Sequence, residues 1–261
     1  MQPYQQLSRS ISGHKAIITG AASGMGRATA HLFASEGAAV AVTDLDQTKC
    51  DVVAQEIQAA GYSGSALPLA LDVTEKVAID TRVAEVAENF GGLDIVVNNA
   101  GFAKHSLIED ESYPGIWDES VAAMLTAHQR IIRAAMPHLR NSKYPRIVNV
   151  ASTEGLGATP GNSPYVAAKH GVIGLTRGLA VDLGRDGITV NCICPGPIRT
   201  GITEAIPEEH KEIYAKRRVP LRRYGIPEEV AHMTLSLVLP AASFLTGTVI
   251  PVDGGLTIKN A

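Results

Sequence analysis

Cysteine and aromatic residues are scarce in this sequence, and neither sign of charge is in large excess. The 261 residues include three cysteines and one tryptophan, and the formal net charge at pH 7 is −3. So few cysteines, and an odd number, argue against a disulfide framework and suit a reducing compartment. The sequence has no basic tract, no interleaving of aromatic and basic residues and no zinc-ligand spacing, so nucleic-acid binding is not expected.

Long apolar runs are also missing, which argues against a membrane partner. No run reaches the roughly eighteen apolar residues that a membrane-spanning helix needs, and residues 1–13 are polar, unlike a secretory signal. We therefore expect a cytoplasmic protein. Its 45% hydrophobic residues are enough to bury a large core, and α/β chains of this length commonly form one domain.

Short apolar runs alternate with helical stretches along the whole chain. Strands are expected near residues 15–19, 39–43, 66–71, 94–97, 146–150, 188–194 and 248–252. This rhythm predicts one doubly wound α/β domain over residues 1–261, with a seven-stranded parallel sheet and helices on both faces. Glycine, proline and charged residues interrupt it after Pro195, so we expect a substrate lid at about residues 196–227.

Tyr165 and Lys169 are separated by one helical turn in Tyr-Val-Ala-Ala-Lys, which would place the phenol beside the ammonium. A nearby cation favours the phenolate and is expected to lower the pKa of the tyrosine toward a working pH. Such a tyrosine takes a proton from an alcohol or gives one to a carbonyl. For this pair alone, chance spacing on a helix is the alternative.

Ser152 follows an expected strand and precedes Tyr165 by thirteen residues. Its hydroxyl would hydrogen-bond to the substrate oxygen from the same side as the tyrosine and would stabilise the negative charge that develops on that oxygen. For an isolated serine, capping the strand end is the alternative. We interpret Ser152, Tyr165 and Lys169 together as the catalytic residues.

A glycine-rich turn lies between the first expected strand and an alanine-rich helix, in Gly20-Ala-Ala-Ser-Gly24-Met-Gly26. Gly20 would permit the tight turn, Gly24 would let the backbone approach a pyrophosphate, and Gly26 would allow close packing. Free N–H groups at the start of the helix attract phosphates. The order of strand, turn and helix predicts a dinucleotide site.

Asp44 ends the second expected strand, eighteen residues beyond Gly26. A carboxylate there accepts hydrogen bonds from both ribose hydroxyls and would repel a 2′-phosphate. Asp46 adds a second negative charge, and no Arg or Lys follows before Lys49. We therefore expect NAD rather than NADP; the alternative is that Asp44 only caps the helix beginning near Asp46.

Further motifs stand in register with these residues. They are Leu71-Asp72-Val73, Asn98-Asn99-Ala100-Gly101, Pro195-Gly196, the segment Pro220–Val230, Thr246-Gly247 and Val252-Asp253-Gly254-Gly255. Together with the glycine turn and the catalytic residues, they resemble the short-chain dehydrogenase/reductase family over nearly the whole chain. The resemblance implies a Rossmann fold, a small-molecule alcohol or ketone substrate and a homotetramer.

The resemblance also implies a role for each matching position. The expected cofactor contacts are Gly20, Ser23, Gly24, Met25, Gly26, Asp44, Leu45, Asp72, Val73, Asn99, Ala100, Gly101, Tyr165, Lys169, Pro195, Gly196, Ile198 and Thr200. Asp72 and Val73 would face the adenine, although Asp72 could instead cap a helix near Thr74 and Val73 could be ordinary core. No metal site is expected, and Cys192-x-Cys194 is interpreted as packing.

Met124 departs from the family pattern, because most members have an asparagine there that helps to hold a water linking the lysine to solvent. A thioether cannot do so, which leaves backbone carbonyls or a different proton path. Ser120 and His128 lie one turn to either side of Met124. His128 is a candidate for a substitute relay, and packing or a subunit contact is the alternative.

The substrate is expected to meet His105, Glu154 and Ile202. A carboxylate at Glu154 would favour a hydroxylated or cationic substrate over an anionic one, unless it is only a solvated loop charge. The predicted function is interconversion of a secondary alcohol and a ketone with NAD(H). The alternatives are a reductase of 3-oxoacyl thioesters of acyl carrier protein or coenzyme A, and a non-catalytic NAD-binding sensor.

Overall fold

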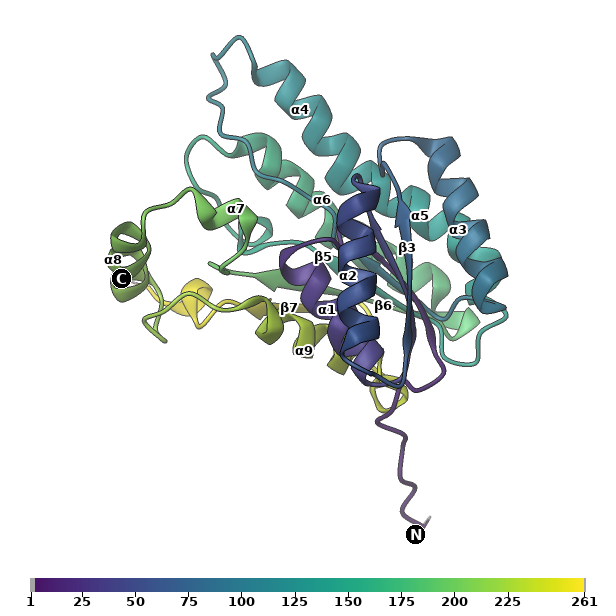
Figure 1. Cartoon of the computed structure of the whole chain (residues 1–261). Coiled ribbons are helices and arrows are strands. Elements are labelled where there is room, and N and C mark those ends of the chain that lie inside the picture. The colour runs from purple at the N-terminus through teal and green to yellow at the C-terminus, as the bar shows by residue number, and fades with distance from the viewer. Residues whose placement is uncertain (1–2, 261) are drawn as a thin grey trace.

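A single parallel sheet of seven strands organises residues 3–260, the part of the chain that the computed structural model describes. The strand order is β3-β2-β1-β4-β5-β6-β7 (Figure 1). The strands are β1 (Lys15–Thr19), β2 (Ala39–Asp44), β3 (Ser65–Ala70), β4 (Ile95–Asn98), β5 (Arg146–Val150), β6 (Thr189–Pro195) and β7 (Val249–Val252). The predicted fold class is confirmed, and each strand lies within two residues of its expected range.

Helices cover both faces of the sheet. They are α1 (Gly24–Ser35), α2 (Gln47–Ala59), α3 (Lys76–Phe90), α4 (Tyr113–Val121), α5 (Ala127–Leu139), α6 (Ser163–Leu183), α7 (Gly201–Glu204), α8 (Glu208–Arg218) and α9 (Pro227–Val238). Successive strand residues point to opposite faces: Ile17 packs in a cluster with residues of α3 and α5, and Ile18 in a cluster with residues of α1 and α9. This burial on both sides explains why the strands are almost wholly apolar.

The strand order reverses between β1 and β4, and this reversal positions the site. The chain moves outward from β1 to β3 and then returns to β4 on the other side of β1. The turns that follow β1 and β4 therefore diverge and leave a crevice at the carboxyl edge of the sheet. The glycine-rich turn and the Asn99–Gly101 segment border this crevice.

The helical path from Tyr113 to Leu139 contains a π-helical turn at Ala122–Thr126, between α4 and α5. Such turns are frequent at functional sites. Ser120, Met124 and His128 are at most 1% exposed. These three residues, which the sequence places one turn apart, all lie on the buried side of this helical path.

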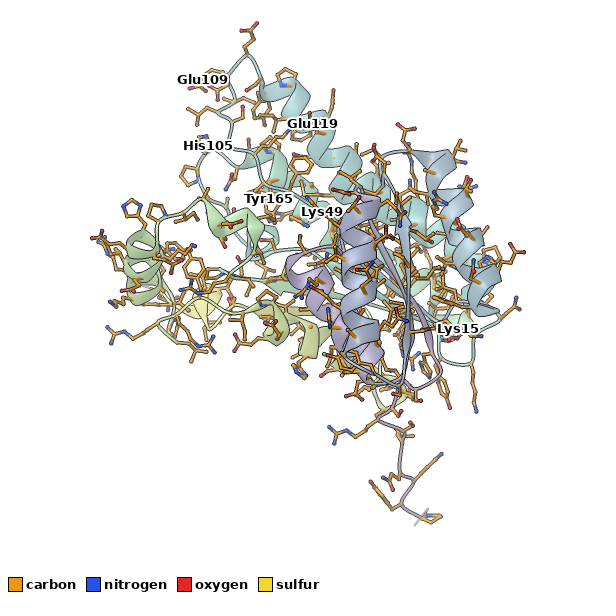
Figure 2. The ribbon with its side chains drawn as sticks, in the orientation of Figure 1. Lys15, Lys49, His105, Glu109, Glu119 and Tyr165 are labelled. Carbon is orange, nitrogen blue, oxygen red and sulfur yellow. The ribbon has the colours of Figure 1, made fainter. Side chains whose placement is uncertain are left out.

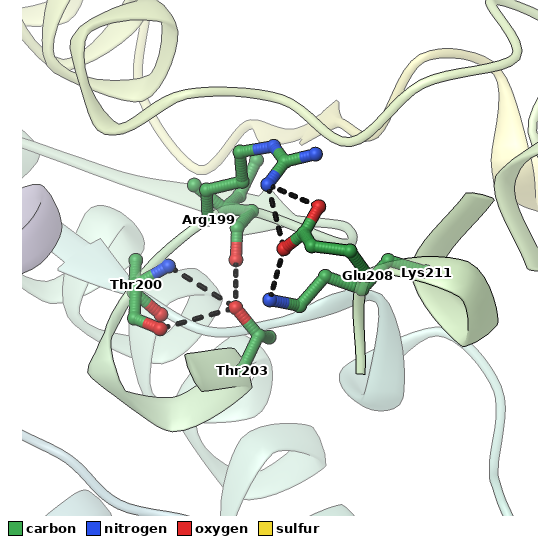
Figure 3. Close-up of polar contacts among 6 residues, drawn as sticks. Arg199, Thr200, Thr203, Glu208 and Lys211 are labelled. Carbon is green, nitrogen blue, oxygen red and sulfur yellow. Dashed lines mark hydrogen bonds and ion pairs between the residues drawn. The ribbon is translucent and has the colours of Figure 1, made fainter. Parts of the chain in front are cut away.

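The segment after β6 contains the short helix α7 and the charged helix α8. Glu208 accepts hydrogen bonds from Arg199 and Lys211, and the hydroxyl of Thr203 bridges the backbone of Ile198 and Thr200 (Figure 3). These contacts hold both helices to the end of β6. Among the described residues, 3–260, no helix combines the length and hydrophobicity needed to cross a bilayer.

Candidate active site

A cavity of about 540 Å³ opens at the carboxyl ends of β1, β2, β3 and β4. Its size falls within the usual range of small-molecule sites. The predicted residues that line it are Gly20, Ser23, Gly24, Met25, Asp44, Leu45, Asp72, Val73, Asn99, Ala100, Gly101, Thr200 and Ile202, and Leu71, Thr74, Phe102, Glu119, Ala123 and Gly201 complete it. Most of the expected cofactor contacts thus share one cavity.

The glycine turn is packed too closely to accept side chains. Gly20 has a φ of +64°, and a Cβ on Gly26 would lie 2.1 Å from the carbonyl oxygen of Gly20. Gly26 is therefore the packing glycine that was predicted, and it lies beneath the turn rather than in the cavity wall. The side chain of Ser23 at the N-cap of α1 makes no capping hydrogen bond. The helix start can therefore offer N–H groups to a phosphate.

Asp44 lies in the cavity wall, where its carboxylate accepts hydrogen bonds from Ala22 N at 3.1 Å and Leu45 N at 2.8 Å. Asp46 caps α2 through Thr48 N at 2.9 Å. The alternative that Asp44 only caps this helix is therefore wrong. Arg27 pairs with Glu56 at 2.8 Å, and none of the residues that line the cavity in the described structure is Lys or Arg.

Asp72 shapes the turn after β3. Its Oδ1 accepts from Thr74 N at 2.8 Å and from the Thr74 hydroxyl at 2.7 Å. Helix α3 begins only at Lys76, so Asp72 holds a turn and does not cap the helix. Val73 lines the cavity with 8% of its surface exposed. Val73 also packs in the core cluster with Leu71 and Ile79, so it belongs to both the cavity wall and the core.

The three predicted catalytic side chains lie close to the carboxyl end of β5: they are Ser152, Tyr165 and Lys169. Helix α6 begins at Ser163 with Pro164 in its first turn, so Tyr165 lies at the helix start and Lys169 one turn later. Lys169 Nζ lies 5.4 Å from the centroid of the Tyr165 ring and donates to Val150 O at 2.9 Å. The Ser152 hydroxyl accepts from Glu154 N at 3.1 Å.

Burial controls the proton affinity of this group. It raises the pKa of Tyr165 above its usual value, and the hydrogen bond from the Ser152 hydroxyl opposes this rise. Burial also lowers the pKa of Lys169 to about 8. The expected lowering of the Tyr165 pKa is thus wrong for the chain by itself. The reason is that burial disfavours the charged phenolate and outweighs the opposing hydrogen bond from Ser152.

Several other predicted cofactor residues do not line the cavity. Pro195 ends β6 in the core, Ile198 is 5% exposed, and a Cβ on Gly196 would lie 2.7 Å from the Asp253 side chain. Tyr165 and Lys169 are likewise absent from its lining.

Of the three expected substrate residues, only Ile202 lines the cavity. His105 packs its ring against Gly161, where a Cβ would meet the ring at 1.9 Å, and Figure 2 shows it on a loop toward the same end of the molecule as Tyr165. Glu154 accepts hydrogen bonds from Thr159 N at 2.8 Å and from the Thr159 hydroxyl at 2.6 Å. Ile202 lies in the cavity wall on α7. Glu154 is thus anchored and is not a freely solvated loop charge.

Thr19 borders the crevice, and the sequence reasoning did not single it out for a role. Its hydroxyl accepts hydrogen bonds from Asn99 N at 3.0 Å and Ala100 N at 3.1 Å, while Asn99 Nδ2 donates to the carbonyls of Thr19 and Gly20. These bonds tie the two sides of the crevice together. A hydroxyl at the end of an apolar strand, directly before a glycine turn, was the available signal.

The cysteines pack in the core. Cys192 and Cys194 are fully buried thiols in β6 that cluster with Val172 and Ile173. Within residues 3–260, no group of three or more His, Cys, Asp or Glu side chains is arranged to hold a metal ion.

Comparison with known proteins agrees with this fold. A family model described as enoyl-(acyl carrier protein) reductase matches residues 20–257. A 3-oxoacyl-(acyl carrier protein) reductase of Thermotoga maritima is 39% identical over 251 residues, which cover 95% of this chain and 99% of that protein. The meso-2,3-butanediol dehydrogenase of Serratia marcescens is 37% identical over 94% of each chain. A short-chain type dehydrogenase/reductase from Mycobacterium marinum, known from a crystal structure, has a TM-score of 0.88 at 33% identity, covering 96% of this chain and 98% of its own.

The doubly wound sheet, the glycine turn at its switch point and these relatives define an oxidoreductase that uses a nicotinamide cofactor. The chain belongs to the short-chain dehydrogenase/reductase family.

Proposed function

We propose that the protein interconverts a secondary alcohol and a ketone by hydride transfer with NAD(H), and that Tyr165 is its general acid and base. The observation that carries the proposal is the convergence of Ser152, Tyr165 and Lys169, with Lys169 Nζ 5.4 Å from the Tyr165 ring. When bound, the cofactor supplies the hydride chemistry. The residues of this chain supply binding, orientation and the proton.

In alcohol oxidation, Tyr165 Oη accepts the hydroxyl proton as the substrate carbon loses its hydride. Ser152 is oriented by Glu154 N–H, and its single hydroxyl proton, which is directed at Tyr165 in the free protein, turns to the substrate oxygen and stabilises the negative charge that develops there. In ketone reduction, the raised pKa keeps Tyr165 protonated at neutral pH, ready to donate. Lys169, which donates to Val150 O, fixes a positive charge beside the ring while it is protonated.

NAD is the proposed cofactor because Asp44 places a carboxylate in the cavity wall. Two backbone N–H groups hold that carboxylate, which leaves further lone pairs for the ribose hydroxyls. The proposal retains the remaining expected cofactor contacts, including Pro195, Gly196 and Ile198. These residues would shape the part of the cofactor site that holds the nicotinamide.

The proposed substrate is neutral and hydroxylated. Burial is the main cause that raises the pKa of Tyr165 and of Tyr214, and the charge of Glu154 adds a smaller rise to each. A carboxylate held between the catalytic tyrosine and α8 would accept from a second hydroxyl group and would repel an anionic substrate. His105 and Ile202 would form the other walls, with the segment 196–227 as the lid.

A second candidate function is reduction of 3-oxoacyl thioesters, which the acyl carrier protein reductase among the relatives favours. Both Asp44 and Glu154 oppose it, since a 2′-phosphate and a phosphorylated carrier are anionic. The third possibility is an NAD-binding sensor without turnover, which the buried thioether of Met124 favours.

The test is NADH formation at alkaline pH over a panel of secondary alcohols, with NADP as the alternative cofactor and Tyr165→Phe as the control. Turnover with NAD that the control abolishes would support the proposal. A preference for NADPH and a 3-oxoacyl thioester would favour the second candidate. Tight NADH binding with no turnover on any alcohol would favour the sensor.

We further propose a homotetramer, carried over from the family resemblance. Val181 on α6 and Phe244 after α9 leave large apolar surfaces exposed, at 83% and 105%, as subunit contacts would require. A cytoplasmic location would suit the three free thiols. Light scattering of the purified protein tests the assembly.

A further inference from the structure

Helix α7 lies between two cavities. Thr200 at its N-cap and Ile202 line the cavity of about 540 Å³ in which the cofactor contacts are expected. Thr203 and Glu204 line a second cavity of about 370 Å³, which lies between α7, α8 and the start of α9. None of the residues of α7 is buried. Packing in the core therefore does not fix the position of this helix.

The four residues of α7 are also too few to hold a helix in place by themselves. Isolated helices shorter than about 12–15 residues are only marginally stable in water. The Thr203 hydroxyl donates to Ile198 O at 2.8 Å and accepts from Thr200 N at 3.1 Å. These bonds shape the turn, but they join only neighbours along the chain. Contacts on either side of the turn must decide where α7 lies.

Glu208, the first residue of α8, makes such contacts. Its carboxylate lies 2.8 Å from Arg199 Nη1 and 2.8 Å from Lys211 Nζ, and Figure 3 shows it between these two cations. Arg199 precedes α7 and Glu208 follows it, so these three residues, here called the Glu208 clamp, join the two ends of α7. The backbone of Arg199 is held as well, because its N–H donates to Gly225 O at 3.0 Å.

The burial of Lys211 makes the carboxylate of Glu208 important. Lys211 is 6% exposed, and within residues 3–260 Glu208 is the one carboxylate that forms an ion pair with it. Hydrogen bonds from Lys211 and Arg199 hold the pKa of Glu208 below its usual value, so the carboxylate is charged at neutral pH. An exposed ion pair contributes little, but loss of the carboxylate would leave a buried ammonium unpaired beside a guanidinium. The two cations would then repel each other.

The clamp acts on the part of the cavity wall that meets the glycine turn. A Cβ on Gly24 would lie 3.3 Å from Thr200 Cγ2, so Thr200 lies directly against that turn. Gly24, Thr200 and Gly201 line both cavities. A movement of α7 toward the second cavity would therefore widen the first one beside the glycine turn.

We propose that Glu208 is a positioning residue for the nicotinamide cofactor: through Arg199 and Lys211 it holds α7 in place, so that Thr200 and Ile202 stay against the bound cofactor. The clamp touches neither the reacting atoms nor the cofactor. It slows the release of the cofactor and has no part in the proton transfer. The proposal goes beyond the proposed function and holds for any alcohol or ketone substrate.

Stopped-flow fluorescence of the bound reduced cofactor tests the proposal. The wild-type protein is titrated with NADH and with NADPH, and the cofactor that binds more tightly is used throughout. We expect Glu208→Gln to release this cofactor about tenfold faster, with an association rate constant that changes less than about threefold. Arg199→Met breaks the clamp without leaving Lys211 unpaired, so it should accelerate release in the same direction. It also decides the question if Glu208→Gln does not fold.

The matched control is Glu212→Gln, one turn along α8. Glu212 is exposed to a similar degree and pairs with Lys216 at 3.2 Å, away from the end of β6. It should leave cofactor release unchanged. Amide hydrogen exchange of the free protein gives a readout that a general loss of stability would not produce. In Glu208→Gln the amides of residues 200–204 should exchange about tenfold faster, while those of β1 and α1 should not change.

Equal release rates for Glu208→Gln, Arg199→Met and Glu212→Gln would overturn the proposal. So would faster amide exchange that is confined to α8, because Glu208 would then only stabilise its own helix. Cofactor binding without turnover of any alcohol would count against the proposed function alone, since release and exchange are measured without a substrate.

Discussion

Replacing Thr19 by valine removes one hydroxyl from the centre of the site and nearly preserves the side-chain shape. Thr19 is 1% exposed, and its Oγ1 accepts from Asn99 N at 3.0 Å and Ala100 N at 3.1 Å. The variant leaves both N–H groups without this partner, at a cost of about 1–3 kcal/mol each. We therefore expect the free energy of unfolding to fall by about 2–6 kcal/mol. For a chain of this size that lowers Tm by about 4–24 °C.

The matched control is Thr43→Val on the neighbouring strand. Thr43 is also 1% exposed, but its hydroxyl makes one bond, donating to Ile18 O at 2.9 Å. Its loss should cost about 1 kcal/mol. Both variants are compared by thermal unfolding and by NADH fluorescence. Because Asn99 and Ala100 line the cavity, Thr19→Val should weaken NADH binding about tenfold or more, and Thr43→Val should not. If the two variants melt together and bind NADH equally well, the Thr19 hydroxyl does not hold the cavity wall.

Four further predictions concern the proposed reaction. Tyr165→Phe should lower kcat by about 10³-fold or more while NADH affinity, measured by fluorescence, changes only a few-fold, because the lost hydroxyl carries the proton; substantial residual turnover would refute its role. Since the pKa of Tyr165 is raised, the phenolate needed for alcohol oxidation is scarce at neutral pH. The kcat/KM for oxidation should therefore rise with pH from 7 to 10, while the kcat/KM for ketone reduction should not rise. An oxidation rate that is flat over this range would contradict the assignment of Tyr165. Asp44→Ser should move the ratio of kcat/KM for NAD over NADP toward NADP by about 10–100-fold, because a fixed negative charge is removed from the ribose site, and an unchanged ratio would place the ribose elsewhere. Glu154→Gln should raise kcat/KM for a 3-hydroxy acid anion relative to a neutral diol by about tenfold. The charge-matched control is Glu111→Gln, at an exposed glutamate on the loop before α4. Equal effects of the two changes would rule out a specific role for Glu154.

Local patterns in the sequence determined most of this fold. The apolar runs predicted the seven strands because a strand covered on both faces must be apolar along its length. This pattern is visible in the sequence without knowledge of which strands are neighbours. The glycine spacing identified the turn after β1, since only glycine fits where a Cβ on Gly26 would lie 2.1 Å from Gly20 O. One helical turn between Tyr165 and Lys169 likewise sufficed to place their side chains together.

The tertiary structure decided what depends on groups distant in the sequence. The direction of the Tyr165 pKa follows from burial by several elements, and the one-turn spacing that suggested a lowered value contains no measure of that burial. The anchoring of Glu154 by Thr159, the two bonds to Thr19 and the unpartnered ring of His128 are equally invisible in the sequence. The physical reason is that solvation and hydrogen bonding are settled by which groups the fold brings into contact, whereas strand and helix periodicity is settled by neighbours along the chain.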